Sequence, residues 1–280
     1  MTDSAKIHEQ AAAQAFNKQA PLFDALYQQD TIIQYKRKRV REHLEQFLQP
    51  HSQILELNAG TGDDAIYLAQ QGHHVHATDI SETMQEILLK KVKAEQLDQH
   101  VTHEICSFTE LENLVQQGPY DHIFSNFAGL NCTGRLSKVL DSFNWLLKPG
   151  GYATLVILPK FCLWEFLLLF KGKFKTAFRR LAGRKGARAH IEGQYFRCWY
   201  YNPAYIRRHL KDSFEVVAVE GLCTMVPPSY IENFAVKHPK LYRFLEKSEN
   251  KWKSKWPWKV MGDYYVITMR KKVVEEEMRG

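Results

Sequence analysis

The chain lacks the long apolar run that a membrane-spanning helix requires. Its longest apolar stretch, residues 161–170, is interrupted by Glu165, whereas a spanning helix needs about 20 consecutive apolar residues. The first residues also lack an apolar segment behind a basic start, so no signal peptide is indicated. These two absences predict a cytoplasmic protein.

Cysteine is scarce and scattered. The five cysteines form no C-x-x-C pair, which argues against a zinc site and a disulfide framework. No metal site is therefore expected. Neither a repeat of fixed period nor a low-complexity segment is present, and 45% hydrophobic and 25% charged residues are ordinary values that argue against disorder. A chain of 280 residues can form one large α/β domain with embellishments.

Acidic residues are nearly missing from residues 171–211. Twelve Lys or Arg stand there against one acid, Glu192, which leaves a local charge of +11 in a chain of net charge +7. Because an apolar stretch directly precedes this basic block, residues 161–188 favour contact with an anionic membrane or an acidic, lipid-like substrate. A substrate-domain helix with a solvated basic face is the alternative. A second basic cluster, residues 36–39, lies in a helical pattern and is interpreted as a solvated face.

The most informative pattern is a strand-like run that ends in a glycine loop. Residues 54–57 are followed by Asn58-Ala59-Gly60-Thr61-Gly62 and then by a helical pattern. Asp79 comes nineteen residues after Gly60, at the end of a second apolar stretch. An acidic residue at that spacing holds ribose hydroxyls in nucleotide-binding folds. The pattern predicts a ligand that contains a nucleoside.

The register of the glycines separates two cofactor classes. Residues 60–65 satisfy the dinucleotide pattern G-x-G-x-x-G/A, but the residue that directly follows the strand is Asn58, one of the few types that tolerate positive φ. In that register Asp63 stands at the third glycine. Its carboxylate would repel a pyrophosphate and suits a cationic sulfonium and ammonium. The loop therefore favours S-adenosylmethionine over a dinucleotide.

Taken together, these motifs resemble those of the class I S-adenosylmethionine-dependent methyltransferases of the small-molecule type. Their first motif, an acidic residue followed by x-G-x-G-x-G, stands here as residues 56–62 with Asn58 for the first glycine. Residues 79–84 resemble the second motif, Ser107-Phe108 sits where the family often has an aspartate beside the adenine, and residues 147–151 resemble the turn before the fifth strand. The resemblance implies S-adenosylmethionine as cofactor, held by Glu56, Asn58, Ala59, Gly60, Gly62, Asp79, Ile80, Met84, Ser107, Phe108, Asn126 and Phe127.

Strands and helices alternate along the middle of the chain. We expect strands at 53–57, 73–78, 101–105, 120–125 and 151–158, and helices at 63–71, 82–94, 108–116 and 134–147. Such alternation predicts an α/β fold, a parallel sheet with helices on both faces. The resemblance implies a Rossmann-like seven-stranded, mostly parallel sheet that residues 214–219 and 264–269 close as an antiparallel pair. Ligands of such sheets bind beyond the carboxyl ends of the strands.

Four segments are expected. They are an N-terminal helical lid (1–50) with a break at Pro21, a Rossmann-like cofactor-binding core (51–158), a substrate or cap insertion after the fifth strand (159–212), and the end of the core sheet with an inserted helical segment (213–280). The resemblance makes Phe16, Tyr27 and Tyr35 candidates to shield the cofactor. Simple packing of these aromatic residues against the sheet is the alternative.

Methyl transfer from a sulfonium is an in-line displacement, so the protein mainly has to hold donor and acceptor together and exclude water. Residues 125–129 resemble neither the Asn-Pro-Pro-Tyr nor the Asp-Pro-Pro-Tyr motif of amide and adenine N-methylating enzymes, and an apolar wall from Phe127 and Leu130 suits a small or hydrophobic acceptor. No spacing singles out a general base. The candidates, all in or beside the insertion, are His190, Tyr195, Tyr200, Tyr201 and His209.

Three functional classes stay open. The first is a methyltransferase that acts on a small-molecule or lipid-like, anionic acceptor. The second is an RNA methyltransferase, which the basic block favours, although no added RNA-binding module or base-flipping Pro-Pro-Tyr signature is visible and a nucleic-acid partner is not expected. The third is a non-catalytic protein of the same fold that binds a cofactor or a partner, which the departures at Asn58 and Ser107 allow.

Overall fold

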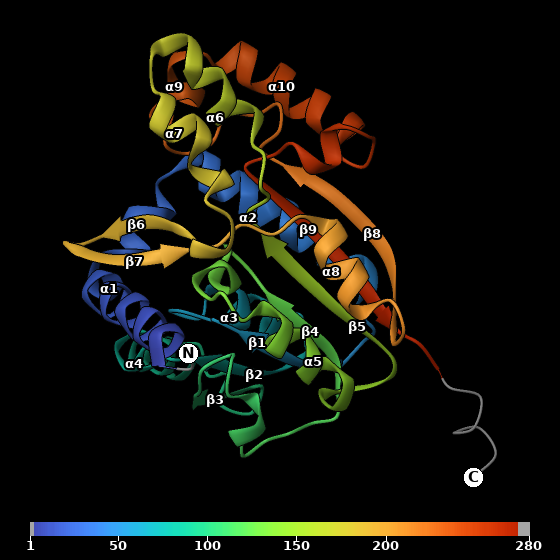
Figure 1. Cartoon of the computed structure of the whole chain (residues 1–280). Coiled ribbons are helices and arrows are strands. Elements are labelled where there is room, and N and C mark those ends of the chain that lie inside the picture. Colours follow the sequence, from blue (N-terminus) through green and yellow to red (C-terminus); the bar gives the residue numbers. More distant parts are fainter. Residues whose placement is uncertain (1–2, 274–280) are drawn as a thin grey trace.

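A seven-stranded sheet forms the centre of the computed structural model, which describes residues 3–273 (Figure 1). The strand order is β3-β2-β1-β4-β5-β9-β8, and only β9 runs antiparallel to its neighbours. This confirms the Rossmann-like, mostly parallel sheet. The strands are β1 Gln53–Leu57, β2 His74–Asp79, β3 Val101–Ile105, β4 Tyr120–Ser125, β5 Leu147–Ile157, β8 Phe214–Leu222 and β9 Tyr264–Lys271.

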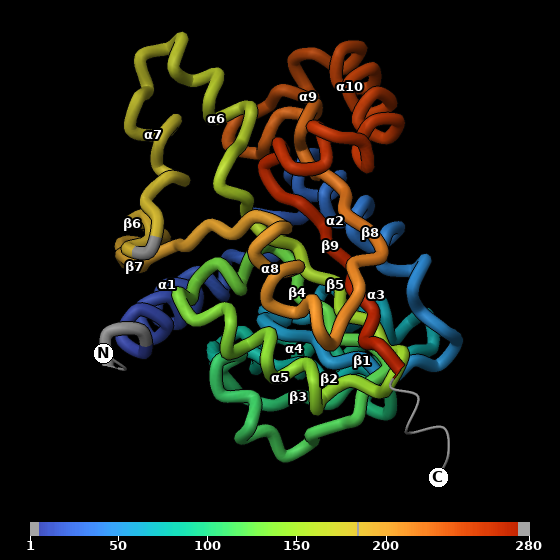
Figure 2. The backbone as a smooth tube through the Cα atoms, turned by 45° about the vertical axis from the view of Figure 1, so that its right-hand side comes forward, coloured from blue at the N-terminus to red at the C-terminus, as the bar shows by residue number. Residues whose placement is uncertain are grey.

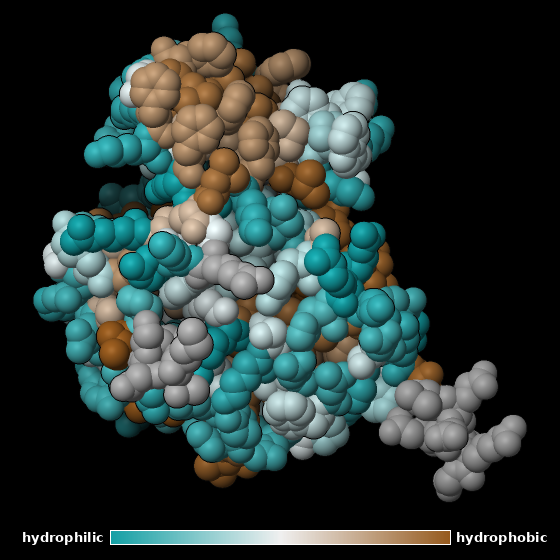
Figure 3. Space-filling view, viewed as in Figure 1, coloured by the Kyte–Doolittle hydropathy of each residue, from teal (hydrophilic) through white to brown (hydrophobic). Residues whose placement is uncertain are grey.

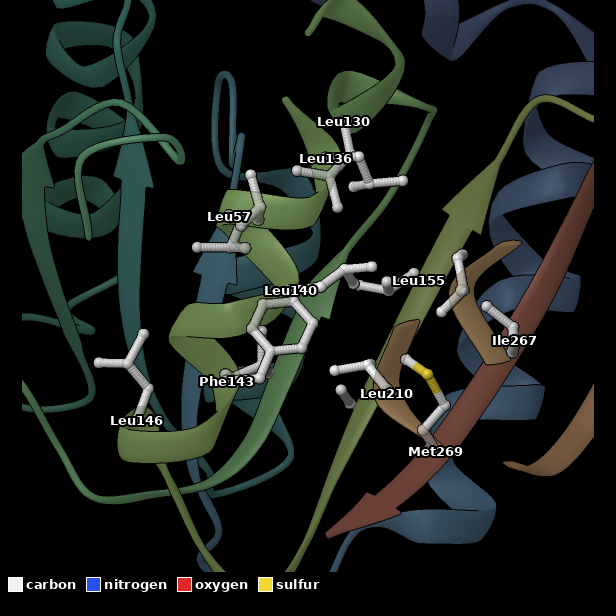
Figure 4. Close-up of a cluster of buried hydrophobic side chains, with 14 of the residues drawn as sticks. Leu57, Leu130, Leu136, Leu140, Phe143, Leu146, Leu155, Leu210, Ile267 and Met269 are labelled. Atoms are coloured by element: carbon white, nitrogen blue, oxygen red, sulfur yellow. The ribbon is translucent and has the colours of Figure 1, made fainter. Parts of the chain in front are cut away.

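Helices cover both faces of the sheet because the strands are apolar on both sides. In β1, Leu55 and Leu57 pack toward α5 (Leu136–Leu146) and α8 (Pro203–Leu210), whereas Ile54 packs toward α2 (Thr31–Leu44), α3 (Asp63–Gln70) and α4 (Glu82–Ala94). Figure 4 shows the first of these cores, with Leu140 of α5 facing the strands. Such two-sided burial is typical of parallel sheets.

Two local expectations were wrong. Residues 108–116 form no α-helix but a single 3-10 turn at Leu111–Asn113, because Ser107 and Thr109 turn their hydroxyls toward Glu9 rather than continue a helical repeat. Pro21 does not break the first helix, and α1 runs through it from Asp3 to Gln28. Side chains before and after the proline anchor α1 to the core: Asn17 accepts from Ser81 at 2.5 Å and Asp24 from Thr61 at 2.6 Å.

The two inserted segments lie at the upper side of the sheet in Figure 1. Between β5 and α8 the chain forms α6 (Leu163–Leu167), α7 (Phe174–Phe178) and the hairpin of β6 (Ala187–Ile191) and β7 (Gln194–Cys198); between β8 and β9 it forms α9 (Phe234–Lys237) and α10 (Pro239–Trp252). The hairpin lies against α1 in both views (Figure 2), with the rings of Phe16 and Phe196 6.0 Å apart. No helix among residues 3–273 is long and apolar enough to cross a membrane.

The basic cluster in α2 is not a solvated face, as had been expected. Lys38 alone is exposed, and the other three side chains are buried because this face of α2 packs onto the fold. Each of the three meets a carboxylate from another element. The pairs are Lys36 with Asp263 at 3.6 Å, Arg37 with Asp63 at 3.3 Å and Asp64 at 3.4 Å, and Arg39 with Glu220 at 3.2 Å.

Candidate active site

A pocket lies at the carboxyl ends of β1, β2 and β4 and is covered by α1. Of the twelve residues expected to hold the cofactor, eleven line it, and Gly62 does not. The residues that do are Glu56, Asn58, Ala59, Gly60, Asp79, Ile80, Met84, Ser107, Phe108, Asn126 and Phe127. They converge because the carboxyl ends of parallel strands share one edge of the sheet.

The two glycines of the loop serve different purposes. Gly60 has φ +57°, and a Cβ there would meet no atom within 4 Å, so its backbone borders open space in the pocket. Gly62 has φ +81°, and a Cβ would come within 2.6 Å of Leu88 Cγ. Gly62 therefore allows the loop to approach α4 closely. Gly62 thus contributes packing beside the pocket, and its contact with the cofactor stays a prediction.

Asn58 joins the tips of β1 and β4. Its φ of +51° is the left-handed conformation expected of a residue that replaces a glycine. The Asn58 amide donates to the carbonyl of Asn126 at 2.9 Å, and Ser125 Oγ donates to Asn58 Oδ1 at 2.6 Å. A Cβ at Gly129 would lie 2.3 Å from Asn58 Cγ. The asparagine side chain fits because residue 129 is a glycine and has no side chain.

Asp79, at the end of β2, is held by the backbone on both sides. Its Oδ2 accepts from the Gly60 amide and its Oδ1 from the Ser81 amide, both at 2.9 Å. Burial raises the pKa of Asp79, while these backbone hydrogen bonds oppose the rise. The carboxylate lines the pocket. It can accept hydrogen bonds from a ligand's hydroxyls there, and it also stabilises the glycine loop.

The wall of the pocket is strongly acidic. Five carboxylates line it, from Glu9, Glu56, Asp63, Asp64 and Asp79, against one guanidinium, from Arg37. Arg37, Arg41 and Lys91 pair with Asp63 and Asp64, but the remaining surplus of acidic acceptors favours a cationic group over a polyphosphate.

Glu56 is the least compensated of these acids. Its side chain is buried, and its Oε2 has no hydrogen-bond partner within the described part of the chain. Burial and the nearby charge of Asp64 raise its pKa well above the usual range. Burial would also raise the pKa of Asp64, but the charges of Arg37 and Arg41 lower it. An ammonium group placed beside Glu56 would supply the missing partner.

The N-terminal helix closes the pocket through Glu9, which sequence reasoning missed. Glu9 accepts from Thr109 Oγ1 at 2.6 Å, from Thr133 Oγ1 at 2.7 Å and from Arg135 at 3.2 Å. A single glutamate on a helix belongs to no motif, so no local signal could have indicated this role. Arg37, another missed residue, places its guanidinium 5.0 Å from the centre of the Phe127 ring.

The apolar part of the pocket differs from the expected one. Phe16 lines it together with Phe23, which had not been singled out, whereas Tyr27 and Tyr35 do not line it. Tyr35 is buried and donates to Glu249 at 2.9 Å. Leu130 is also absent from the wall, because it lies in the hydrophobic core beside α5. Phe127 is the one residue of the predicted apolar wall that borders the pocket.

None of the candidate general bases lines the pocket. His190 and Tyr195 pair across the β6–β7 hairpin with ring centres 4.5 Å apart, and both are exposed, since alternate residues of this hairpin face away from α1. Tyr200 is buried beneath the guanidinium of Arg180, 5.3 Å from its ring centre. His209 bonds to Asp141 at 2.7 Å, and the Tyr201 hydroxyl donates to the carbonyl of Thr133 at 2.6 Å.

Two arginines of the basic block are paired with carboxylates of the same chain, and one of them, Arg180, is buried. Arg179 and Arg180 bond to the buried Glu165 at 2.5 and 2.6 Å, and Arg180 also bonds to Asp263 at 2.7 Å. Cys162, Glu165 and Asp263 are close enough to hold a metal ion, and they are the one such group among the described residues. The two arginines already bind these carboxylates. The side chain of Arg184 lies outside the described residues.

Comparisons with known proteins agree with this geometry. Residues 54–151, about a third of the chain, match a family model described as a methyltransferase domain. None of the curated proteins compared matches the chain.

Solved structures extend the likeness to nearly the whole chain. The [4+2]-cyclase SpnF has a TM-score of 0.62 at 15% identity and covers 95% of this chain and 97% of its own. The 1,6-didemethyltoxoflavin-N1-methyltransferase of Burkholderia thailandensis, with bound 1,6-didemethyltoxoflavin and S-adenosylhomocysteine, has a TM-score of 0.56 at 16% identity over 96% and 91%. The geranyl diphosphate C-methyltransferase of Streptomyces coelicolor has a TM-score of 0.55 at 12% identity, and the match covers 85% of this chain and 79% of that one. At these identities the likeness shows the fold.

Proposed function

We propose that the chain is an S-adenosylmethionine-dependent methyltransferase that transfers a methyl group to a small, largely apolar acceptor, and the match of residues 54–151 to a methyltransferase domain supports this. The observation that carries the proposal is that one pocket combines two kinds of lining. Carboxylates line it beside the glycine loop, and Phe16, Phe23 and Phe127 contribute apolar surface. The carboxylates would suit the methyl donor, and the apolar surface would suit the acceptor.

The pocket offers a partner for each polar part of S-adenosylmethionine. Asp79 would accept from the ribose hydroxyls, and the unpartnered oxygen of Glu56 would accept from the ammonium group. Ser107 and Phe108 would border the adenine. When bound, S-adenosylmethionine supplies an electrophilic methyl group on a cationic sulfonium, which the surplus of carboxylates in this wall favours. The residues present therefore fit the cofactor.

The pocket would act on the acceptor by positioning. No histidine, lysine or tyrosine lies among the described residues that line the pocket, and Asp63 and Asp64 are engaged with arginines and with Lys91. The helix α1 covers part of the pocket, and it would limit the access of water to a bound acceptor. The chain would accelerate an in-line displacement by holding the acceptor against the methyl group in a dry site, without a dedicated base.

Labelled S-adenosylmethionine tests this function directly. The protein is incubated with S-adenosylmethionine that carries a labelled methyl group, in parallel with an organic-soluble cell extract and with total RNA. We expect the label to enter the organic-soluble fraction. Label in RNA alone would instead support the RNA methyltransferase. Binding of S-adenosylmethionine without transfer to any fraction would support a non-catalytic protein that binds the cofactor. The likeness to a [4+2]-cyclase illustrates that this fold is not confined to methyl transfer.

A further inference from the structure

An apolar surface is exposed over α6 and α7, at the upper end of the molecule (Figure 3). We call it the docking face and define it by the exposed side chains of Phe166, Leu167, Phe170, Phe174, Phe178 and Leu181. Phe170 is 85% exposed, Leu181 64% and Phe174 61%. Water-soluble proteins seldom expose so many neighbouring large apolar side chains unless the surface binds something.

The charges within the docking face have one sign. Between Phe166 and Ile191 the sequence has eight Lys or Arg and no acid. Arg179 and Arg180 are bound to Glu165, but Lys171, Lys173, Lys175 and Lys185 are exposed. Three of these lysines alternate with Gly172 and Phe174, so cationic and apolar groups share one short stretch of surface.

This composition favours one occupant over another. A second protein chain is the usual partner of an exposed apolar face, yet lysine is depleted at protein–protein interfaces. Phenylalanine and leucine combined with lysine are typical of segments that insert into the headgroup region of anionic bilayers. We propose that the docking face binds the protein to the surface of an anionic membrane, with its phenylalanines among the acyl chains and its lysines at the lipid phosphates.

The docking face is attached to the edge of the sheet that carries the pocket. The strand β5 ends at Ile157, six residues before α6 begins at Leu163. The amide of Ala128, in the loop after β4, donates to the carbonyl of Val156 at 3.1 Å. The buried pairs of Arg180 with Glu165 and Asp263 hold α6 and the following turn to the start of β9. Membrane docking would therefore bring the pocket close to acceptors dissolved in lipid. This last step rests on the proposed function.

Co-sedimentation with vesicles tests the docking face. We expect the wild-type protein to bind vesicles of phosphatidylcholine mixed with phosphatidylglycerol, to ignore pure phosphatidylcholine, and to release as salt is raised. Neutralising Lys171, Lys173 and Lys175 to glutamine should weaken binding about a hundredfold, at roughly fivefold for each lysine near an anionic surface. The double variant Phe170→Ser/Phe174→Ser should also lose binding.

Matched controls separate docking from general charge and from folding. Lys90→Gln/Lys93→Gln removes exposed lysines from α4, and Val115→Ser removes an apolar side chain that is 92% exposed elsewhere. Both should bind vesicles like the wild type. All variants should keep the wild-type affinity for S-adenosylhomocysteine, which tests the proposed function separately from docking.

Two results would overturn the inference. One is a failure in the vesicle assay: either the wild-type protein does not sediment with anionic vesicles at low salt, or the docking variants sediment as strongly as the wild type. The other is a wild-type dimer in sedimentation velocity that Phe170→Ser/Phe174→Ser converts to a monomer without vesicle binding in either form. That second result would make the face an interface between two copies of the chain.

Discussion

The turn after β1 depends on Asn58 and Gly129, whose side-chain sizes are complementary. Asn58 stands where related loops have a glycine, and its side chain occupies the space that Gly129 leaves free, since a Cβ at 129 would lie 2.3 Å from Asn58 Cγ. Asn58 cannot swing away, because it is hydrogen-bonded to Ser125 and Asn126. The departure from the family pattern is thus compensated by a local partner and leaves the turn intact.

The variant Gly129→Ala should therefore be destabilised by about 1–3 kcal/mol, the usual cost of overpacking. Adding Asn58→Gly should recover most of that loss, since glycine removes the obstructing atoms and adopts positive φ readily. Urea unfolding of the two single variants and the double variant measures the coupling. Strictly additive free energies of unfolding would show that the two positions are not linked.

A second prediction concerns Asp79. Replacing the carboxylate with the amide of Asp79→Asn keeps the size of the side chain but removes the charge and one acceptor. We expect S-adenosylmethionine binding to weaken by about 1.5–3 kcal/mol, the range for hydrogen bonds to a charged group. Calorimetric titration gives the affinity. Because Asp79 also accepts from the Gly60 and Ser81 amides, thermal unfolding is the control, and a lost fold with unchanged affinity would make Asp79 purely structural.

At the scale of elements, Glu9 attaches α1 to the loops after β3 and β4, and we propose that α1 serves as a lid over the pocket. The variant Glu9→Gln should loosen that attachment and leave the sheet intact. A neutral amide accepts weaker hydrogen bonds from Thr109, Thr133 and Arg135 than the Glu9 carboxylate does. Hydrogen exchange should become faster in α1 and unchanged in α5. Bound S-adenosylhomocysteine should restore part of the protection.

The control for this lid prediction is Lys18→Gln, an exposed position on the same helix. It should exchange like the wild type. Equal protection of α1 in the Glu9→Gln variant and the wild type would mean that apolar contacts, such as that of Phe16 with Phe196, hold the lid without Glu9.

The strands and helices of the core could be predicted from periodicity. The structure of residues 108–116, the continuity of α1 and part of the pocket could not, because they depend on residues that are distant in the sequence. The expected helix at 82–94 matches α4 at both ends because its N-cap, Ser81, and its apolar repeat are local signals. Residues 108–116 follow a similar cap signal, Ser107-x-x-Glu110, but Thr109 bonds to the distant Glu9 and the segment forms only a 3-10 turn. The anchors that keep α1 continuous through Pro21 also come from distant residues. Likewise, eleven pocket residues follow from motifs at strand ends, while Glu9 and Arg37 reach the pocket from helices without any motif.

For the whole molecule, buried histidines make stability depend on pH. His122 is buried in the sheet and bonds to Thr154 at 2.9 Å, and burial lowers its pKa to about 3. Below the ordinary histidine pKa of about 6.5, His122 is protonated in the unfolded chain but stays neutral in the folded chain. The free energy of unfolding should therefore fall as pH drops from about 6.5 toward 3, by roughly 1.4 kcal/mol per pH unit from this group.

Urea unfolding at pH 7 and pH 5 measures this effect. The variant His122→Gln should show a shallower loss of stability on acidification than the wild type. The lowered pKa values of His73 and His76 contribute a slope of the same sign in both proteins, and the raised pKa values of Glu56 and Asp79 contribute one of the opposite sign. An identical slope in both proteins would show that His122 does not carry the dependence.

Calorimetric titration of the wild-type protein with S-adenosylmethionine, S-adenosylhomocysteine and NAD tests the central claim most directly. That claim is that the acidic pocket beneath α1 holds S-adenosylmethionine. The structure predicts that S-adenosylmethionine and S-adenosylhomocysteine bind one per chain, in the same pocket. NAD should not bind, because five carboxylates and one guanidinium line that pocket and the carboxylates would repel a pyrophosphate. Binding of NAD with no heat from S-adenosylmethionine or S-adenosylhomocysteine would contradict the account.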